Sequence, residues 1–198
     1  MTTIALFDFD GTLTYKDSFR AYLQFSSTPF VFWFKNYLLS LPYAVLYKFK
    51  LISTHKFKEV RLKLFLTQKS AAELERLSND FATIIIPKII KKSGLERINW
   101  HKAEGHQIWI VSASFDIVLE KWCNQNNIGL LTNKAERNNS NRLTGHFPKP
   151  DCNYEEKVHR IKKAIDLQNV STIYAYGDTS GDRAMLNLAH YPHFCFFD

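Results

Sequence analysis

The chain begins with TTIALFDFDGTLTYKDSF, residues 2–19, and this stretch decides which fold class we expect. The apolar run Ile4–Phe7 predicts a short buried strand. Two carboxylates, Asp8 and Asp10, follow it directly, and Gly11 permits a tight turn beside them. Two like charges this close repel each other, and burying them is costly unless a cation compensates. The pattern therefore indicates a metal site, phosphate chemistry, or both.

Apolar runs alternate with helical patterns along the rest of the chain. Further strands are expected at residues 107–111, at 128–132, in a run that ends at Asp178, and as an edge strand within 193–198. Strands that alternate with helices predict an α/β fold, with a parallel sheet covered by helices on both faces. In such sheets ligands bind at the carboxyl ends of the strands.

Three of the expected strands end in polar side chains, which would meet at one edge of a parallel sheet. These polar ends are Asp8 with Asp10, Ser112 with Ser114, and Asp178 with Asp182. An aspartate can attack phosphorus and form an acyl phosphate, and a second carboxylic acid can protonate the leaving oxygen and later deprotonate water. The sequence thus favours phosphoryl chemistry at this edge.

Mg²⁺ is the cofactor that this chemistry predicts, because it takes oxygen ligands and offsets the charge of a phosphate. We expect the carboxylates of Asp8 and Asp178 and the backbone carbonyl of Asp10 to ligate it. Asp182, four residues after Asp178, is expected to bind a metal-bound water or to orient the loop.

Phosphate-binding groups are expected from two further segments. Ser112 can donate a hydrogen bond to a phosphate oxygen, with the amide of Ala113 beside it. Lys157 falls in the first turn of a predicted helix, where it adds a positive charge to the amide end and can neutralise both phosphate and Asp8. Asn153 is the predicted cap of that helix.

Four motifs occur in a fixed order along the chain. They are DFDGTLT at 8–14, VSAS at 111–114, EEK at 155–157 and GDTSGD at 177–182. In this order they resemble the haloacid dehalogenase superfamily, and more narrowly its phosphoserine-phosphatase-like branch, subfamily IB. The resemblance covers essentially the whole chain, and it implies a Rossmann-like core, Mg²⁺, an aspartyl-phosphate intermediate and phosphatase activity on a small phosphorylated molecule.

The resemblance also implies a role for each matching residue, and no position departs from the pattern. Asp8 would be the nucleophile and a metal ligand, Asp10 the acid and base, Gly11, Ser112, Ala113 and Lys157 the phosphate site, Asp178 a metal ligand, and Asp182 its support. An aspartate at position 10 favours hydrolysis over dehalogenation, since haloacid dehalogenases lack that acid.

A helical cap is expected immediately after the first motif. Residues 1–15 and 88–198 would form the core, and residues 16–87 the cap, in which Pro42 should kink or split a helix. The family resemblance implies that the cap covers the phosphate site and contacts the rest of the substrate.

Four cap residues are candidates for substrate contacts. Asp17 and Ser18 follow the first motif and are expected to face the leaving group. Arg20 and Arg61 can contact a carboxylate or a second phosphate of the substrate, and surface salt bridges explain them equally well. The cap resembles those of relatives that act on lipid precursors such as phosphatidylglycerophosphate, or on phosphosugars, more than the cap of phosphoserine phosphatases.

Residues 29–52, PFVFWFKNYLLSLPYAVLYKFKLI, are unusually aromatic. The uncharged run 36–47 is too short to span a membrane, which needs about 20 residues. Two interpretations remain open, with equal weight: a cap core that packs on itself, or an acyl-chain groove or membrane-facing surface flanked by basic residues.

Composition narrows the classes of partner and the compartment. The 198 residues carry a net charge of +7, and no RNA-binding motif or zinc-finger spacing accompanies the basic residues, so nucleic acid is not expected. The basic balance fits a solvated positive face or attraction of anionic substrates. Three unpaired cysteines and the lack of a secretory leader predict a cytoplasmic protein, or one peripheral to the inner face of a membrane. We expect a monomer.

The sequence therefore predicts a Mg²⁺-dependent phosphomonoester phosphatase. Two rivals remain. A non-catalytic membrane- or lipid-binding module on a phosphatase-like core would explain the aromatic cap and the positive charge, although such a protein need not keep both acid pairs. A phosphotransferase would share the chemistry but pass the phosphoryl group to an acceptor alcohol.

Overall fold

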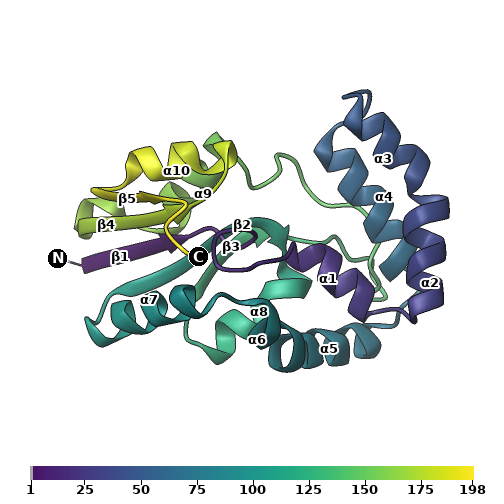
Figure 1. Ribbon diagram of the computed structural model, residues 1–198, viewed down its shortest axis with the longest axis horizontal. Coiled ribbons are helices and arrows are strands. Elements are labelled where there is room, and N and C mark those ends of the chain that lie inside the picture. Colours follow the sequence, from purple (N-terminus) through teal and green to yellow (C-terminus); the bar gives the residue numbers. More distant parts are fainter. Residues whose placement is uncertain (1) are drawn as a thin grey trace.

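The core of the protein is a five-stranded parallel sheet with the strand order β3-β2-β1-β4-β5 (Figure 1). A computed structural model describes residues 2–198. The strands are β1 (Thr2–Phe7), β2 (Gln107–Phe115), β3 (Gly129–Asn133), β4 (Val170–Gly177) and β5 (Tyr191–Phe194). The parallel α/β sheet is confirmed, with two differences in extent. The second strand continues beyond residue 111, and the last strand lies at 191–194, before most of the expected 193–198.

The central strand β1 is buried on both faces, and its side chains alternate between two hydrophobic clusters. Ile4 and Leu6 point to one cluster, and Ala5 and Phe7 point to the other. The first cluster includes residues of α9 and α10, and the second includes residues of α7 and α8, so helices cover both faces of the sheet (Figure 1). These helices are α7 (Lys92–Ala103), α8 (Asp116–Gln125), α9 (Glu155–Ala164) and α10 (Arg183–Leu188).

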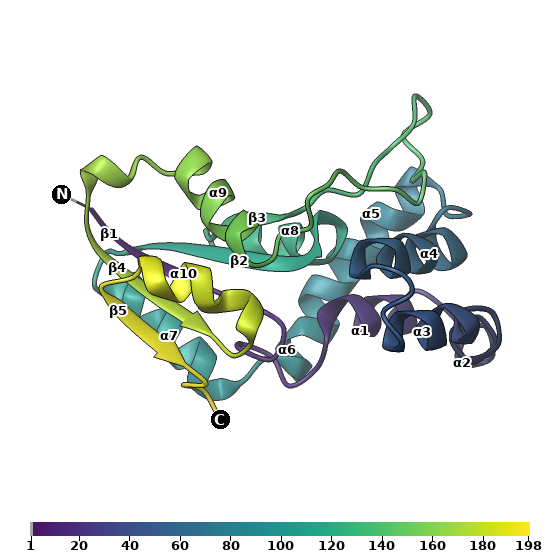
Figure 2. The ribbon, with the colours of Figure 1, turned by 90° about the horizontal axis from the view of Figure 1, so that it is seen from above.

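The helices between β1 and α7 lie mainly beyond the carboxyl ends of the strands (Figures 1 and 2). They are α1 (Ser18–Phe25), α2 (Pro29–Trp33), α3 (Leu41–Lys48), α4 (Thr54–Leu66), α5 (Ala71–Asp80) and α6 (Ile86–Ile89), with π-helical segments η1 (Phe34–Leu39) and η2 (Phe81–Ile85). Buried residues of α1, α4 and α5 belong to the same hydrophobic cluster as Phe7. Helix α6 crosses the expected boundary between residues 87 and 88, and the division into core and cap stays a prediction.

Each π-helical segment directly precedes a proline-containing helix start. Pro42 lies in the first turn of α3, after η1, and Pro87 lies in the first turn of α6, after η2. Proline has no amide hydrogen, and its ring clashes with the carbonyl four residues earlier, at Leu38 and at Thr83. Both of those carbonyls lie inside the π segments, where the wider turn relieves the clash. Pro42 is expected to kink or split a helix. In the structure it coincides with the change from the π-helical segment η1 to the α-helix α3.

The long segment between β3 and α9 reaches over α4 (Figure 2). The alternation of residues 135–147 around the turn at 138–141 predicts a hairpin, but in the structure the two arms share one isolated bridge, between Arg137 and Leu143, and this part of the described chain has no regular strand. Instead the segment binds the cap. His146 contacts the carboxylate of Glu59 on α4 with an N–O distance of 2.5 Å.

Two short 3-10 helices, η3 (Leu167–Asn169) and η4 (Ser180–Asp182), complete the fold. All three cysteines have free thiols, as expected for a chain without a disulfide framework. Within residues 2–198, no helix has the length and apolar character needed to cross a bilayer.

Candidate active site

Polar side chains from three strand ends converge on a cavity of about 170 Å³ between the sheet and the cap. The lining residues are Asp8, Asp10, Asp17, Phe19, Lys58, Ser112, Ala113, Ser114, Asn153, Lys157, Thr179 and Asp182. Each of the four motifs thus contributes at least one residue to the wall of this cavity. The parallel sheet explains this, because it places the ends of β1, β2 and β4 at one edge.

Asp8 is the centre of the cluster and is only 7% exposed. Its Oδ1 atom accepts a hydrogen bond of 2.6 Å from Lys157, while the described residues provide no hydrogen bond to its Oδ2 atom. Burial raises the pKa of Asp8 to about 6; repulsion from Asp182 and Asp178 adds to the rise, and Lys157 offsets part of it. One carboxylate oxygen of Asp8 therefore remains available for chemistry.

Lys157 is a fully buried cation, 1% exposed, with three acceptors. Its ammonium donates to Asp8 at 2.6 Å, to Asp182 at 2.6 Å and to the carbonyl of Val111 at 2.7 Å. Burial opposes its charge, but the two carboxylates outweigh burial and hold the pKa of Lys157 above its usual range. The side chain is thus charged and directed into the site.

The start of helix α9 differs from the expected cap. Tyr154, with φ of 50°, occupies the cap position, and the side chain of Asn153 accepts a hydrogen bond from the amide of Tyr154. The amide of Tyr154 also donates to the carbonyl of Gly181, at 3.0 Å. This contact joins the helix that carries Lys157 to the segment that carries Asp182.

Asp10 lies at the amino end of α1. Its Oδ1 atom accepts a hydrogen bond of 2.6 Å from the amide of Ser18. Burial raises the pKa of Asp10 to about 8, and the charges of Asp17 and Asp8 add to the rise. Near neutral pH this carboxyl group therefore holds a proton, which is what a general acid requires.

Asp178 and Asp182 have different environments. Asp178 is half-buried, and its Oδ1 atom accepts a hydrogen bond of 2.8 Å from Thr12. Asp182 uses one oxygen for Lys157 and the other for the amide and hydroxyl of Thr179, at 2.9 and 2.8 Å. Burial would raise the pKa of Asp182, but Lys157 lowers it below the usual range. Asp182 is therefore suited to orient the loop, as one of the two expected roles.

The acidic residues fit a hard divalent cation. One oxygen each from Asp8, Asp178 and Asp182 lie within 4.8 Å of one another. All three donors are oxygens, which Mg²⁺ prefers. Lys157 pairs with only two of these three carboxylates, and repulsion from Asp182 and Asp178 adds to the rise that burial causes in the pKa of Asp8. A further cation between Asp8 and Asp178 would relieve that repulsion.

Gly11 has a structural reason to be glycine. Its φ is +86°, and a Cβ atom there would collide with the carboxylate of Asp178. The residue therefore allows the turn after β1 to approach the end of β4. Gly11 lies in an adjoining cavity of about 200 Å³ with Asp178, and its expected contact with phosphate stays a prediction.

Ser112 and Ala113 line the cavity where β2 passes beside β1. The Ser112 hydroxyl accepts a hydrogen bond from the amide of Ser114, at 3.1 Å, so its own hydrogen is available for another acceptor. The Ala113 carbonyl is held by Lys58 and by the side chain of Asn133, both at 2.8 Å. These contacts fix the backbone of the strand end.

Of the four expected cap contacts, Asp17 alone is among the residues that line the cavity, and it caps α1 by accepting a hydrogen bond from the amide of Arg20. Ser18 is buried behind it and bonds to Ser114, which does line the cavity, at 2.9 Å. Arg20 and Arg61 do not line the cavity. Arg61 packs against the rings of Phe19 and Phe57.

Lys58 is a lining residue that the sequence analysis did not single out. It reaches from α4 across to the core, where its ammonium contacts Asp151 at 2.7 Å as well as the Ala113 carbonyl. Its spacing along α4 does not distinguish it from Lys56 or Lys63. Only the fold of the segment after β3, which brings Asp151 to α4, reveals its position.

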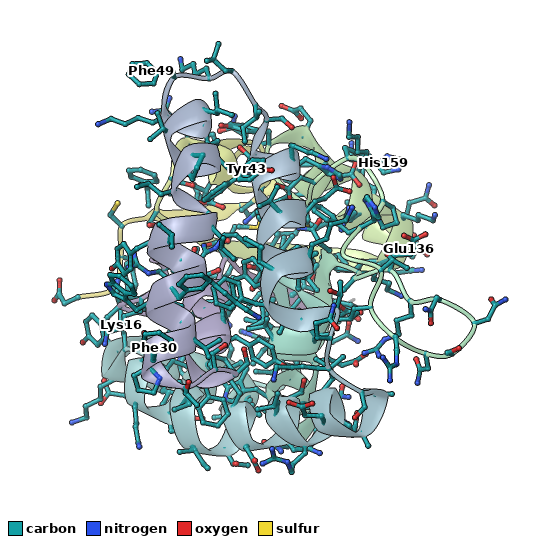
Figure 3. All side chains as sticks on the ribbon, turned by 90° about the vertical axis from the view of Figure 1, so that its right-hand side faces the viewer. Lys16, Phe30, Tyr43, Phe49, Glu136 and His159 are labelled. Atoms are coloured by element: carbon teal, nitrogen blue, oxygen red, sulfur yellow. The ribbon has the colours of Figure 1, made fainter. Side chains whose placement is uncertain are left out.

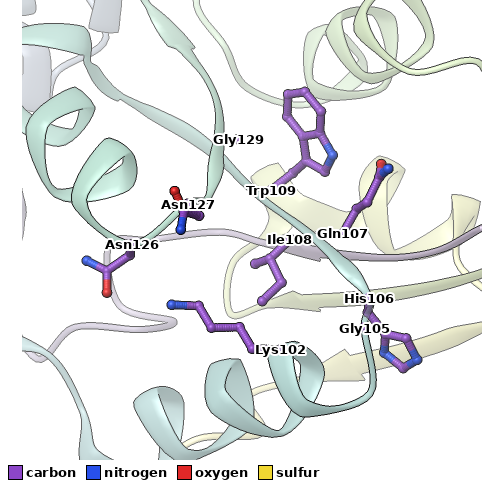
Figure 4. Close-up of a pocket in the computed structure, with 9 residues that line it drawn as sticks. All are labelled: Lys102, Gly105, His106, Gln107, Ile108, Trp109, Asn126, Asn127 and Gly129. Atoms are coloured by element: carbon purple, nitrogen blue, oxygen red, sulfur yellow. The ribbon is translucent and has the colours of Figure 1, made fainter.

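A larger cavity, of about 570 Å³, lies at the opposite end of β2 (Figure 4). Its polar side chains are basic or neutral, including Lys102, His106, Gln107 and Asn126. It contains no carboxylate and lies at the amino end of the strand. The chemistry of the four motifs therefore belongs to the smaller cavity.

The model of the haloacid dehalogenase-like hydrolase family matches residues 5–187. Protein CicA from Caulobacter vibrioides is 31% identical over 187 residues, which is 94% of this chain and 82% of that protein. Both findings agree with the family resemblance of the four motifs. The match spans the whole cap as well as the core.

Solved structures share the fold. A protein of unknown function from Bordetella pertussis Tohama I has a TM-score of 0.80 at 21% identity, covering 96% of this chain and 87% of that one. A substrate-bound phosphoserine phosphatase has a TM-score of 0.65 at 17% identity, covering 96% and 83%. A phosphoserine phosphohydrolase-like protein from Francisella tularensis SCHU S4 has a TM-score of 0.62 at 20% identity, covering 98% and 86%. They confirm the expected Rossmann-like α/β fold.

Proposed function

Because this chain belongs to the haloacid dehalogenase-like hydrolases, we propose that it is a Mg²⁺-dependent phosphomonoester phosphatase with Asp8 as the nucleophile. One observation carries the proposal. The buried ammonium of Lys157 holds one oxygen of Asp8, the other oxygen has no hydrogen bond from the described residues, and Asp8 and Asp10 line the same cavity. A charged nucleophile and a protonated acid therefore share one small space.

The first step transfers the phosphoryl group to the enzyme. The free oxygen of Asp8 attacks phosphorus, and a new P–O bond forms as the bond to the leaving oxygen breaks. Asp10 gives its proton to that leaving oxygen, which departs as an alcohol. The raised pKa of Asp10 supports this role, since the proton is present near neutral pH.

The second step restores the enzyme. Asp10, now a carboxylate, removes a proton from water, and the oxygen of that water attacks phosphorus. The bond between phosphorus and Asp8 breaks, so that inorganic phosphate leaves and Asp8 regains its carboxylate. Lys157 and Ser112 can donate hydrogen bonds to the phosphoryl oxygens, with the amide of Ala113 beside them, which lowers the barrier to both steps by charge stabilisation.

Asp8, Asp178 and the backbone carbonyl of Asp10 are the proposed ligands of Mg²⁺, with Asp182 as their support. When bound, the ion supplies positive charge that draws the phosphate toward the carboxylate of Asp8. Asp182 meanwhile keeps Lys157 and the amide of Thr179 in place through hydrogen bonds. The all-oxygen donor set supports this assignment.

The proposed substrate is a small phosphorylated metabolite or a phospholipid precursor, with phosphatidylglycerophosphate-like or phosphosugar compounds preferred over phosphoserine. A cavity of about 170 Å³ limits the buried part to the phosphoryl group and the atoms next to it. The cap places Asp17, Phe19 and Lys58 at the wall of the cavity, where the leaving group would lie.

Substitution Asp8→Asn tests the proposal. The variant keeps the shape of the side chain but lacks a nucleophilic carboxylate, so Mg²⁺-dependent hydrolysis of p-nitrophenyl phosphate should fall to the background rate. Asp80→Asn is a matched control, because Asp80 lies on α5 and pairs with Arg76 on the surface. Full hydrolysis by a folded Asp8→Asn protein would reject the proposal.

A further inference from the structure

The segment that contains α2, η1 and α3 exposes large apolar side chains along its whole length. We call the exposed apolar side chains of residues 29–51 the aromatic face. They are Phe30, Val31, Trp33, Phe34, Tyr37, Leu38, Leu39, Leu41, Tyr43, Val45, Leu46, Tyr47, Phe49 and Leu51. Phe30 is 73% exposed, Phe49 is 69% exposed and Leu51 is 70% exposed. Soluble monomers rarely leave so many adjacent apolar side chains in water.

Helices α2 and α3, which carry the aromatic face, lie at one end of the molecule, away from the sheet (Figure 1). Phe30 and Phe49 lie near opposite ends of the helical segment in Figure 3, with Tyr43 between them. Within residues 29–51 only Phe32 and Ser40 are buried, and Phe32 packs against Phe65 of α4. Phe32 and the stacking of Tyr47 on Phe57 of α4 fasten the segment to the rest of the cap, while most of its apolar side chains stay exposed. This exposure disfavours a self-packed cap core for most of the segment.

Charge distinguishes this end of the molecule from the rest. No Asp or Glu occurs between Asp17 and Glu59, whereas that stretch carries Arg20, Lys35, Lys48, Lys50, Lys56 and Lys58. Lys48, Lys50 and Lys56 are exposed, and the first two flank Phe49 in the sequence. An apolar surface whose own segment carries only positive charges is complementary to a lipid bilayer with an apolar interior and negatively charged headgroups.

We propose that the aromatic face binds the surface of an anionic lipid bilayer. Trp and Tyr side chains favour the headgroup level of a membrane, where the ring is buried and its polar atom stays hydrated. Phe and Leu side chains reach the acyl boundary, and the lysines interact with anionic headgroups. The segment lies in the interface and does not cross it, since no described helix is suited to span a bilayer.

A second copy of this chain is a less suitable partner for the aromatic face than a lipid surface. A symmetric dimer through the aromatic face would bring Lys48 and Lys50 of both copies together, with no acidic residue of the segment to compensate. Like charges across an interface oppose association. An anionic lipid surface removes that repulsion and covers the same apolar area.

Lipid binding would place the bilayer against the domain that carries the cavity wall. Helix α1 contains Phe19, which lines the cavity, and α2 begins four residues after α1 ends. The proposal is independent of the phosphatase chemistry, because the aromatic face contains none of the cavity-lining residues. Binding can therefore be measured without turnover.

Co-sedimentation with vesicles tests the proposal. The full chain should sediment with vesicles of phosphatidylcholine mixed with phosphatidylglycerol, and far less with phosphatidylcholine alone. Added salt should weaken binding, because it screens the lysines. Lys48→Gln should weaken binding roughly five-fold, the equivalent of about 1 kcal/mol for a lysine near an anionic surface.

The double variant Trp33→Glu with Phe49→Glu should bind roughly ten-fold more weakly or not at all, since it removes two apolar contacts and adds two negative charges. The matched control is Ile84→Glu with Tyr191→Glu, which alters exposed apolar side chains outside the aromatic face. Circular dichroism and hydrolysis of p-nitrophenyl phosphate should be unchanged in both double variants.

Three outcomes would overturn the proposal. The first is no sedimentation of the folded chain with anionic vesicles. The second is equal sedimentation by the Trp33→Glu/Phe49→Glu variant and by the wild-type chain. The third is a concentration-dependent dimer that the same variant abolishes, without vesicle binding, which would assign the aromatic face to a second copy. Loss of phosphatase activity alone would leave the lipid-binding result standing.

Discussion

Two regions of the molecule place side chains where their polarity is unfavourable. The carboxylate cluster at the ends of β1 and β4 buries charged groups, whereas the aromatic face of the cap exposes apolar groups to water. In the cluster, Asp8 and Asp182 are buried charges, and Lys157 is a buried cation between them. In the aromatic face, Phe30 and Phe49 are apolar side chains left in water. Neither arrangement favours stability by itself, because buried charge and exposed apolar surface both cost free energy.

The comparison indicates what each region is arranged for. In the cluster, Lys157 offsets part of the negative charge, and one oxygen of Asp8 has no hydrogen bond from the described residues, which suits a reaction. The apolar groups of the aromatic face have no compensation within residues 2–198, which suits a partner. Substitutions in the cluster should therefore change both stability and catalysis, and substitutions in the aromatic face should change neither in solution.

The largest effect on stability is expected from Lys157→Met. This change leaves Asp8 and Asp182 buried without their cation, so the free energy of unfolding should fall by about 3–5 kcal/mol. Urea unfolding followed by circular dichroism measures it. Lys162→Met is the matched control, because Lys162 is exposed on the same helix and should change stability by less than about 0.5 kcal/mol. Equal stability of the two variants would show that the buried cation does not hold the cluster together.

The buried histidine of α7 tests, through pH, whether burying an uncompensated charge lowers stability. His101 is 0% exposed, and burial, together with the charges of His106 and Arg97, lowers its pKa to about 3 from an ordinary 6.5. Below pH 6.5, His101 therefore binds a proton in the unfolded chain. In the folded chain it stays unprotonated until the pH is near 3. Acid thus favours unfolding, and this contribution to stability is lost as the pH falls through 6.5.

At pH 4.5 His101 alone should lower the free energy of unfolding by about 3 kcal/mol relative to pH 7. Urea unfolding of the wild-type chain and of His101→Gln at both pH values measures the difference. The variant should lose less stability on acidification, by about that amount. His159→Gln, at an exposed position of α9, is the control and should follow the wild type. Equal losses of unfolding free energy on acidification in all three proteins would contradict the assignment of this pH dependence to His101.

The sequence predicted the cluster far better than the cap. Asp8, Asp10, Ser112 and Lys157 could be placed together because each ends a strand or begins a helix, and a parallel sheet brings those ends to one edge. Lys58 could not be placed, because its position depends on a segment after β3 that has almost no regular structure.

The aromatic residues of the cap were harder to interpret for a different reason. A stripe of aromatic side chains at helical spacing has the same pattern whether it packs inward or faces out. The burial of Phe32 and the exposure of Trp33, the next residue, follow from how α2 packs against Phe65. That is a tertiary contact, which periodicity does not encode.

An intermediate effect is expected from Lys58→Met, which removes the contact between α4 and the core. The ammonium holds Asp151 and the Ala113 carbonyl at the wall of the cavity, so kcat/KM for p-nitrophenyl phosphate should fall about ten-fold, or about 1.4 kcal/mol. Lys134→Met, at an exposed position, should leave kcat/KM unchanged. An unaltered kcat/KM in Lys58→Met would show that this contact does not position the site.

The smallest effect is expected from Phe49→Ser in the aromatic face. Because Phe49 is 69% exposed, the free energy of unfolding in solution should change by less than about 0.5 kcal/mol. By contrast, Phe32→Ala removes a buried ring and should cost about 3 kcal/mol or more. Thermal and urea unfolding of the two variants compare them directly. A large loss in Phe49→Ser would mean that the aromatic face stabilises the cap itself.

The most direct measurement for the central claim is detection of phosphate bound covalently to Asp8. The wild-type chain is mixed with Mg²⁺ and substrate, quenched in acid and digested, and the peptides are examined by mass spectrometry. A phosphate adduct on Asp8 is expected, with more of it in Asp10→Asn because the hydrolysis step lacks its base, and none in Asp8→Asn. An adduct on a different residue, or rapid turnover by Asp8→Asn, would contradict the account.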